Sequence, residues 1–323
     1  MKKALDFIVI GSATLDIIIR SDELTIVRSR GRLYSCIKYS SKIEMDHLEF
    51  DPGGSGHNIS VGLATLGNRV GLVTTIGDDE YGKTVLRSLK KAGVYLEGVK
   101  VVRTTMTGTS IILIGKRGER SIIVYRSANN LLSKKHIKKS LLKNSKYLVF
   151  TSVLSRESVE AIKKAVDIAS KNDVKVLPTP SISMIKKFRE DINGLLFKSY
   201  GMILNEEEIK YLTQRKNVRE ALKRLERFGL RFVVVTMGEK GAICYDGKRI
   251  YKQKAFKVKP IDTTGAGDTF AAAFYHYLNK NKSLPECLEF ACATAAINIT
   301  TYGATRDFPK EREIINFIKQ RKS

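Results

Sequence analysis

The sequence predicts an α/β protein with a doubly wound, mostly parallel β-sheet that is flanked by helices and carries a small β-sheet lid. Three observations support this prediction. Short apolar, β-branched runs recur along the chain, segments with helical periodicity lie between them, and two stretches with strand character interrupt the alternation. Strands that are separated by helix-length segments form right-handed βαβ units, which place the strands parallel in one sheet.

The predicted strands of the main sheet are the apolar runs at 7–11, 71–77, 146–152, 175–179, 201–205 and 232–238. Helices are predicted between them, for example at 155–171 and 217–229, where apolar residues recur at helical spacing. We assign residues 1–18, 51–102 and 128–323 to one α/β core.

Two segments are expected to form extra β structure that projects from this sheet. Residues 19–50 contain alternating stretches such as KIEMDHLEF, and residues 103–127 predict a hairpin in which TSIILIG and SIIVYR are joined by KRGE. We assign 19–50 and 103–127 to a β lid, because a lid that closes over an active site excludes water from the reaction.

The composition indicates a globular protein. The chain has 323 residues, of which 43% are hydrophobic, and a formal net charge of +24. This charge would suit nucleic acid, anionic lipid or a phosphorylated substrate, but Lys and Arg are spread along the whole chain, which favours a solvated basic surface. No stretch approaches the ~18 apolar residues of a transmembrane helix. We therefore expect a soluble, cytoplasmic protein that binds neither nucleic acid nor membrane.

Residues 77–84 read GDDEYGKT and match the phosphate-loop pattern G-x-x-x-x-G-K-[ST]. A phosphate loop aims backbone N–H groups at a polyanion, whereas Asp78, Asp79 and Glu80 would repel one. Lys83 supplies only one compensating charge. We therefore predict a strand, an acidic turn and a helix here, and not a nucleotide site.

The strongest functional signal is DTTGAGDTFAAAFYHYL at 262–278. Gly265, Ala266 and Gly267 form a turn that leads into a helix, so free N–H groups and the helix dipole would form an anion hole. Asp268 lies in the first helical turn, where it would orient an attacking hydroxyl and accept its proton. Because the dipole favours the ionised carboxylate, Asp268 is expected to be a weak base. The structural alternative is an aspartate that stabilises an ordinary glycine turn.

The chain resembles the ribokinase-like PfkB family of carbohydrate kinases, both in the segment that contains Asp268 and in four further segments. DTTGAGDTF is similar to the C-terminal signature of the family and DPGGSGHN (51–58) to its N-terminal one, and NEEE (205–208), TMGEKG (236–241) and GDDEYG (77–82) match its shorter motifs. The resemblance implies a kinase that uses ATP and Mg²⁺ to phosphorylate a hydroxyl of a small sugar or nucleoside. It makes Asp268 the base and the 265–267 backbone the anion hole, and the α/β core the part that binds nucleotide and substrate.

The resemblance also implies a pocket for the acceptor. Its residues would be Thr14, Asp16, Gly53, Gly54, Ser55 and Asn58. An aspartate can accept hydrogen bonds from two neighbouring hydroxyls, and glycines let the backbone approach a sugar ring. The structural alternatives are a turn residue for Asp16 and a tight turn or helix cap for Gly53 and Gly54.

The nucleotide and metal residues are implied in the same way. The nucleotide would be held by Asn205, Thr236, Gly238, Gly241 and Asn298. Glu208 would organise waters on Mg²⁺, and Asp262 with Thr264 would join the 303–305 region in a site for a monovalent cation such as K⁺. The structural alternatives are a first-turn helix acid for Glu208, a turn between strands for the 236–241 loop, and a locally bonded helix residue for Asn298.

Several questions stay open at this level. These are the identity of the sugar or nucleoside, ATP against ADP as donor, an acceptor that already carries a phosphate, and the need for a monovalent cation. Tyr34, Tyr39 and Phe50 keep a nucleoside acceptor open, because a base needs an aromatic or apolar lid. A basic nucleic-acid-binding α/β protein is the alternative from another class. We expect a homodimer that forms through the lid.

Overall fold

The main sheet is parallel and five-stranded. The structure is a computed structural model that describes residues 4–115, 120–301, 303, 305 and 307–322. The strand order is β11-β10-β1-β6-β7, with bounds β1 (Leu5–Ile10), β6 (Val70–Gly77), β7 (Val99–Val102), β10 (Ser145–Phe150) and β11 (Lys175–Pro178).

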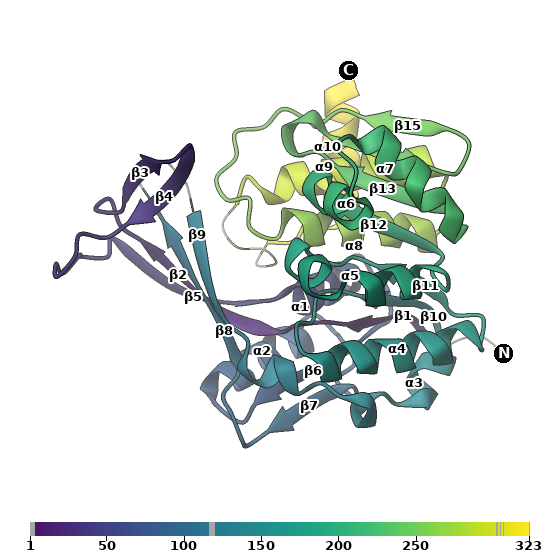
Figure 1. The fold of residues 1–323 in the computed structure, drawn as a ribbon, viewed down its shortest axis with the longest axis horizontal. Helices are drawn as coiled ribbons and strands as arrows, with labels where there is room; N and C mark the ends of the chain where they lie inside the picture. The colour runs from purple at the N-terminus through teal and green to yellow at the C-terminus, as the bar shows by residue number, and fades with distance from the viewer. Residues whose placement is uncertain (1–3, 116–119, 302, 304, 306, 323) are drawn as a thin grey trace.

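A second set of strands continues this sheet beyond β11. The N–H group of Tyr200 donates to the carbonyl oxygen of Val176 at 2.8 Å and so links the two sets. β12 (Gly201–Asn205) and β13 (Phe232–Thr236) are parallel, and β14 (Ala242–Tyr245) and β15 (Ile250–Gln253) follow antiparallel. Strands β6 and β7 thus lie on one side of β1, and β10, β11 and the second set lie on the other side. The predicted doubly wound, mostly parallel sheet is confirmed (Figure 1).

Helices cover both faces of the sheet because its strands are apolar on both sides. Phe7 and Val9 of β1 pack with α1 (Ser55–Thr65), α2 (Glu80–Lys91), α8 (Ala266–Asn279), α9 (Leu284–Asn298) and α10 (Glu311–Lys322). Ile8 and Ile10 pack on the other face with α3 (Lys139–Lys143), α4 (Arg156–Ser170), α5 (Ile182–Leu196), α6 (Glu206–Thr213) and α7 (Val218–Leu225). Short 3₁₀ helices lie at Ser127–Leu131, Lys134–His136, Glu226–Phe228 and Gly238–Lys240.

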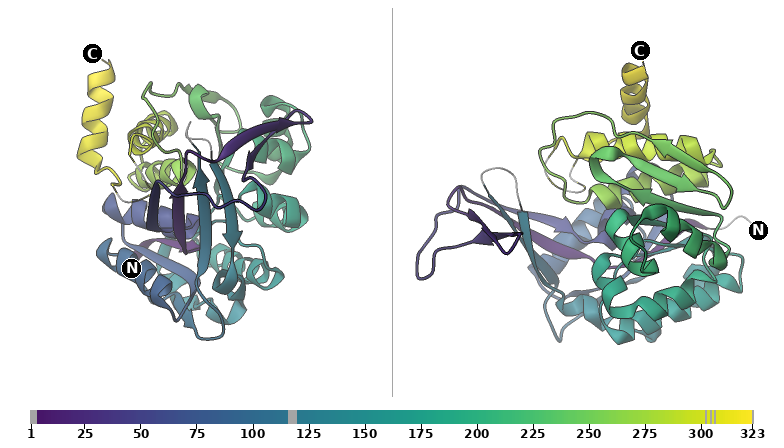
Figure 2. Two further views of the ribbon diagram at one scale, coloured as in Figure 1. Left: turned by 90° about the vertical axis from the view of Figure 1, so that its left-hand side faces the viewer. Right: turned by 45° about the horizontal axis from the view of Figure 1, so that its top comes forward.

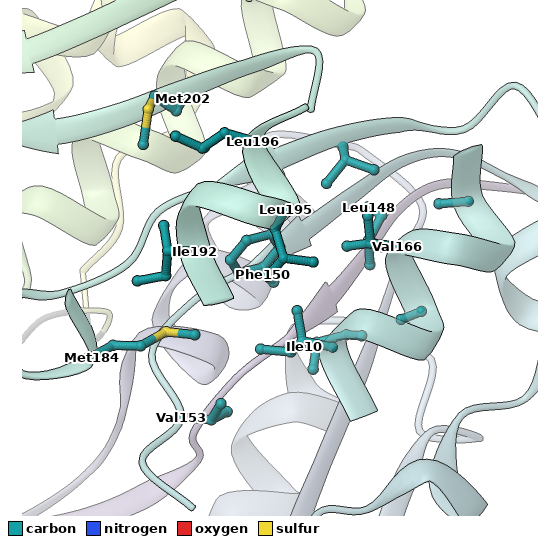
Figure 3. Close-up of a cluster of buried hydrophobic side chains, with 14 of the residues drawn as sticks. Ile10, Leu148, Phe150, Val153, Val166, Met184, Ile192, Leu195, Leu196 and Met202 are labelled. Atoms are coloured by element: carbon teal, nitrogen blue, oxygen red, sulfur yellow. The ribbon is translucent and has the colours of Figure 1, made fainter. Parts of the chain in front are cut away.

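The second of these faces holds a continuous apolar core. Ile10, Leu148 and Phe150 of the sheet meet Val166 of α4 and Ile192 of α5 in Figure 3. All five side chains are fully buried. This packing sets the position of the carboxyl ends of the strands, where the candidate site lies.

A separate mixed sheet projects from the helix-covered core, as the two further views confirm (Figures 1 and 2). Its order is β5-β2-β8-β9, with β2 (Thr14–Arg20), β5 (His47–Gly53), β8 (Gly108–Ile114) and β9 (Arg120–Tyr125). The hairpin of β3 (Thr25–Ser29) and β4 (Arg32–Cys36) lies at its outer end. The predicted hairpin in 103–127 is confirmed as β8 and β9, and its KRGE turn lies outside the described residues.

One prediction of strand structure is wrong in part. Within KIEMDHLEF, only the residues from His47 onward form a strand, and residues 42–46 have no regular structure. The reason is that β2 ends at Arg20, opposite His47, so no partner strand is left. The Ser21 hydroxyl instead donates to the Glu44 carbonyl oxygen at 2.7 Å. Among the described residues, no helix is long and apolar enough to cross a membrane.

Candidate active site

The GDDEYGKT segment is a strand, a turn and a helix, as predicted. Asp79 caps α2 by accepting the N–H group of Gly82 at 2.7 Å, which is a group that a phosphate loop would offer to a nucleotide. It also accepts the N–H and hydroxyl groups of Thr107, both at 2.7 Å. The ammonium group of Lys83 pairs with Glu80 at 2.6 Å. This segment therefore joins β6 to α2, and its cap and ion pair occupy groups that a phosphate loop would offer to a triphosphate.

Asn58 and Asp268 meet although they are 210 positions apart in the chain. Asn58 lies in the first turn of α1 and Asp268 in the first turn of α8, and these two helices pack together. The Asn58 amide Nδ2 donates to Asp268 Oδ2 at 2.9 Å. The two glycine-rich signatures of the sequence therefore come together at one place in the fold.

Burial governs the protonation of Asp268. It raises the pKa of this carboxyl to about 6, against the effect of hydrogen bonds from Asn58 and Ser55, and the charge of Asp16 adds to the rise. The prediction of a weak base is therefore wrong, because desolvation outweighs the helix dipole and the hydrogen bonds. A carboxylate with this pKa is ionised at neutral pH and still basic enough to accept a proton.

Backbone donors face the same region. Gly265 caps the amino end of α8 in the left-handed conformation, with φ 71°, which favours glycine. Among the described residues, no acceptor bonds the N–H groups of Gly265 and Gly267, and the N–H group of Ala266 reaches the Thr263 carbonyl oxygen only at 3.4 Å. A Cβ at Gly267 would meet no atom within 4 Å. The turn can therefore offer donors to an anion at the amino end of α8.

Asp16 is held on β2 by two hydroxyl groups. Thr14 Oγ1 donates to Asp16 Oδ1 at 3.1 Å, and Ser110, which is paired with Asp16 on β8, donates as well. Burial raises the pKa of Asp16, and these two hydroxyls lower it. Since Asp16 also contributes to the raised pKa of Asp268, the two carboxylates act on each other electrostatically.

Gly53 and Gly54 allow close approaches beside Asp16. A Cβ at Gly53 would lie 2.1 Å from Asp16 Oδ2, because Gly53 is paired with Thr14 on the neighbouring strand. Gly54 caps α1 with φ 90°, and a Cβ there would lie 2.8 Å from the carbonyl oxygen of Ser12. Gly54 has the cap geometry of the structural alternative, whereas Gly53 ends β5, and the Asp16 carboxylate occupies the space that a side chain at 53 would fill.

Sequence reasoning missed two residues that position this group. Ser110 bonds Asp16, and Asn129 fixes the turn between β1 and β2. The Asn129 side chain accepts the N–H group of Ala13 and donates to its carbonyl oxygen, both at 2.9 Å. The pairing of β2 with β8 and these contacts over 116 positions have no local signal in the sequence.

Asn205 and Thr236 end neighbouring parallel strands and are paired in register, so their predicted placement at the carboxyl edge of the sheet is confirmed. Asn205 Oδ1 also accepts the N–H group of Glu208 at 2.9 Å and caps α6.

Glu208 completes this cap and lies within the electrostatic influence of Asp268. Its Oε2 accepts the N–H group of Asn205 at 2.7 Å, which is the bonding of a first-turn helix acid. Burial raises the pKa of Glu208 to about 7, and the charges of Glu207 and Asp268 add to the rise. The described residues contain no group of three or more His, Cys, Asp or Glu side chains that could hold a metal ion by themselves.

The remaining residues of the predicted nucleotide site are two glycines in a turn and a buried asparagine. Gly238 and Gly241 have φ 58° and 95° in the turn between β13 and β14, and a Cβ at Gly241 would lie 2.0 Å from the Gln253 carbonyl oxygen. Asn298 is 1% exposed, and its Oδ1 accepts the Thr269 hydroxyl at 3.2 Å. The two glycines have the turn geometry of their structural alternative, whereas the bond of Asn298 joins α9 to α8 over 29 positions and is not a local helix bond.

Asp262 connects the two parts of the predicted cation region. Its Oδ1 accepts the N–H group of Thr264 at 2.8 Å, and its Oδ2 accepts the N–H group of Gly303 at 3.1 Å. Residue 304, which belongs to the predicted region, lies outside the described residues.

Comparison with known proteins defines the class of this chain. Residues 5–311 match the pfkB family carbohydrate kinase model. A deoxyribokinase of Salmonella typhi is 27% identical over 97% of this chain and 99% of the relative, and a ribokinase of Haemophilus influenzae is 32% identical over 83% and 87%. The solved structure of Arabidopsis thaliana ribokinase complexed with ribose and ATP is 25% identical, with a TM-score of 0.81, over 98% of this chain and 99% of that one.

These findings identify a phosphotransferase with the ribokinase-like fold. The chain belongs to the pfkB family of carbohydrate kinases. The prediction of the family from the sequence is confirmed.

Proposed function

We propose that the protein transfers the γ-phosphate of ATP to a hydroxyl of a small sugar, with Asp268 as the base and the 265–267 backbone as the anion hole. The observation that carries this proposal is the hydrogen bond from Asn58 to Asp268, which joins the two glycine-rich segments. Beside this carboxylate, with its pKa of about 6, lies a glycine turn in which the N–H groups of Gly265 and Gly267 have no acceptor among the described residues.

The acceptor would bind between Asp16 and Asp268. Asp16 would accept hydrogen bonds from hydroxyls of the sugar, and Gly53 and Gly54 would let the ring approach the backbone. Ser55 and Asn58 bond Asp268 and would hold its carboxylate toward the attacking hydroxyl. Asp268 would accept the hydroxyl proton as the bond to phosphorus forms, and the turn at 265–267 would meet the negative charge of the phosphoryl oxygens.

The nucleotide would lie along the carboxyl edge of β12 and β13, against Asn205, Thr236 and the turn at 238–241. Asn298 would lie near the adenine, where its buried side chain is held by the Thr269 hydroxyl. Glu208 would hold Mg²⁺ through water, and the ion supplies positive charge that neutralises the phosphates. Asp262 and Thr264, which are already joined to Gly303, would form the site for K⁺.

A small sugar is the preferred acceptor because of the relatives. Two relatives are a deoxyribokinase and a ribokinase, and the Arabidopsis ribokinase structure contains ribose and ATP. A nucleoside is the second candidate, since Tyr34, Tyr39 and Phe50 of the small sheet and its hairpin leave 45%, 94% and 48% of their surface exposed.

We also infer that the small sheet serves as a lid and as the contact of a homodimer. Its outer part exposes large apolar side chains, among them Leu33 at 64% and Ile123 at 58%. Such a patch marks an interaction site, and a second copy of this sheet would cover it. Sedimentation velocity measures the mass directly, and a monomer at micromolar concentration would contradict this inference.

The experiment for the proposed function is ADP formation from ATP and Mg²⁺ against free sugars, sugar phosphates, polyols and nucleosides. Asp268→Asn serves as the blank and Asp167→Asn, which removes an exposed carboxylate bonded to Lys198, serves as the matched control. We expect one strong responder among the free sugars with wild type and with Asp167→Asn. A panel in which only nucleosides respond would replace the sugar with the second candidate.

A further inference from the structure

A cavity of about 500 Å³ lies at the amino-terminal edge of the sheet. Lys175 begins β11, and Tyr200 and Arg231 immediately precede β12 and β13. Asn205 and Thr236 end the same two strands, so this cavity and the candidate active site lie at opposite edges. The loop between β14 and β15 and the junction of α8 and α9 complete the walls. We call this cavity the amino-edge pocket.

The amino-edge pocket gathers basic side chains from four distant parts of the chain. These are Lys175, Arg231, Lys248 and Lys282. Lys282 pairs with Glu286 at 3.3 Å, whereas the other three have no carboxylate within 4 Å in the part of the chain that the structure describes. Since like charges repel, a negatively charged ligand would stabilise this arrangement.

The single carboxylate of the lining is bonded within its own loop. Asp246 Oδ1 accepts the N–H groups of Lys248 and Arg249 at 2.8 and 2.6 Å, and Asp246 Oδ2 accepts the Tyr251 hydroxyl at 3.0 Å. These bonds lower the pKa of Asp246, so it stays ionised and fixed. Asp246 therefore shapes the loop that presents Lys248 and does not pair with the cations across the cavity.

Aromatic side chains of Tyr147, Tyr200 and Phe232 form the floor of the pocket. Phe232 is 1% exposed and Tyr147 is 5% exposed. The ammonium group of Lys175 lies 4.6 Å from the ring centroid of Tyr200 and 5.7 Å from that of Tyr147, which holds this cation over the floor. Leu278 and Leu284 add an apolar wall. The pocket thus combines cations, which would bind a phosphate group, with some apolar surface, which would contact a carbon skeleton attached to it.

We propose that the amino-edge pocket binds a small organic phosphate at a second site, separate from the kinase reaction. Arginine and lysine side chains that converge from several segments recognise phosphate groups, and the apolar wall would contact the carbon skeleton. Helix α8 carries Asp268 in its first turn and Leu278 near its end, a separation of about 15 Å along the helix. The pocket is therefore too far away to hold the reacting groups.

The lysine-rich groove between α3 and α4 provides the matched control. It has a volume of about 880 Å³ and is lined by six lysines, but Glu160 neutralises Lys134 and Lys163. Its lining includes no aromatic side chain. Lys139→Gln with Lys143→Gln removes two charges there, and Arg231→Gln with Lys248→Gln removes two from the amino-edge pocket.

Calorimetric titration with inorganic pyrophosphate tests the proposal on the full chain. The variant Arg231→Gln/Lys248→Gln is expected to bind pyrophosphate at least about tenfold more weakly than wild type, and Lys139→Gln/Lys143→Gln within about twofold of it. Equal weakening in both variants would reduce the effect to general surface charge and overturn the proposal. Wild-type affinity in Arg231→Gln/Lys248→Gln, or no binding to wild type at millimolar pyrophosphate, would do the same.

A local reporter separates this site from the kinase site. The chain has no Trp, so Tyr200→Trp introduces a single tryptophan into the pocket. Its fluorescence is expected to change with pyrophosphate and to saturate at the calorimetric Kd. An unchanged signal during binding would place the phosphate elsewhere and overturn the proposal. Neither outcome depends on kinase activity, so failure here leaves the proposed function intact.

Discussion

Asp268→Asn is expected to lower the turnover number about 1,000-fold, because positioned general bases contribute roughly 10²- to 10⁴-fold. The change is nearly isosteric, and the new side chain keeps an oxygen that can accept the Asn58 hydrogen bond. The KM for ATP should therefore stay within about threefold of wild type, since ground-state contacts survive. Steady-state kinetics with the responding sugar measure both quantities. Wild-type turnover in this variant would remove Asp268 from the mechanism.

Asp268→Asn is expected to stabilise the folded protein while it lowers the activity. A gain in stability would show that the loss of activity does not come from misfolding. Burial raises the pKa of Asp268 from 3.8 to about 6, so the folded state binds this proton more tightly than the unfolded state. The stability gained from protonation is present below about pH 4 and is lost as the pH rises through about 6. Asp268→Asn should therefore be more stable than wild type at pH 8, by about 3 kcal/mol, and most of the difference should be lost at pH 4. Denaturant unfolding at both pH values checks this sign.

Gly53→Ala is expected to raise the KM for the sugar about 30-fold and to leave the KM for ATP within about twofold. The new Cβ would lie 2.1 Å from Asp16 Oδ2, so the carboxylate must move away from its position beside Thr14. Loss of hydrogen bonds from substrate hydroxyls to a charged acceptor costs about 2 kcal/mol. Initial rates with each substrate varied in turn separate the two KM values.

Gly194→Ala is the matched control for this change. Gly194 lies within α5, and a Cβ there would meet no atom within 4 Å. This variant should keep both KM values and gain about 0.5–1 kcal/mol in stability, because alanine is the better helix residue. Equal KM changes for sugar and ATP in Gly53→Ala would indicate general distortion and contradict the role of Asp16 in binding the sugar.

Local features of the sequence were sufficient for the main sheet and for one edge of the candidate site. The apolar runs at 201–205 and 232–238 predict two strands, and parallel strands bring Asn205 and Thr236 to the same edge. The acidic turn at 77–84 was also predictable, because the charges of its side chains argue against a bound polyanion. The resemblance to two family signatures gave Asp268 and Asn58 roles in the same active site, although the sequence does not show that their side chains are in contact.

Properties that depend on contacts between distant segments were not predictable. The helix dipole at Asp268 is a local feature, whereas its burial requires α1, α8 and Asp16 of the small sheet to assemble around it. The contact of Ser110 with Asp16 depends on the pairing of β2 with β8. The alternating pattern at 42–46 predicts a strand, but a strand also needs a partner, and β2 ends at Arg20. Register and burial arise only in the folded chain.

The most direct test of the central claim is transfer of the terminal phosphoryl group of labelled ATP to the responding sugar as a function of pH. We predict that wild type labels the sugar with a rate that falls tenfold per pH unit below about pH 6, where Asp268 becomes protonated, and that Asp268→Asn forms roughly a thousandth of the product. Label that appears in inorganic phosphate while the sugar stays unlabelled, or a rate that is unchanged from pH 8 to pH 5, would contradict the account.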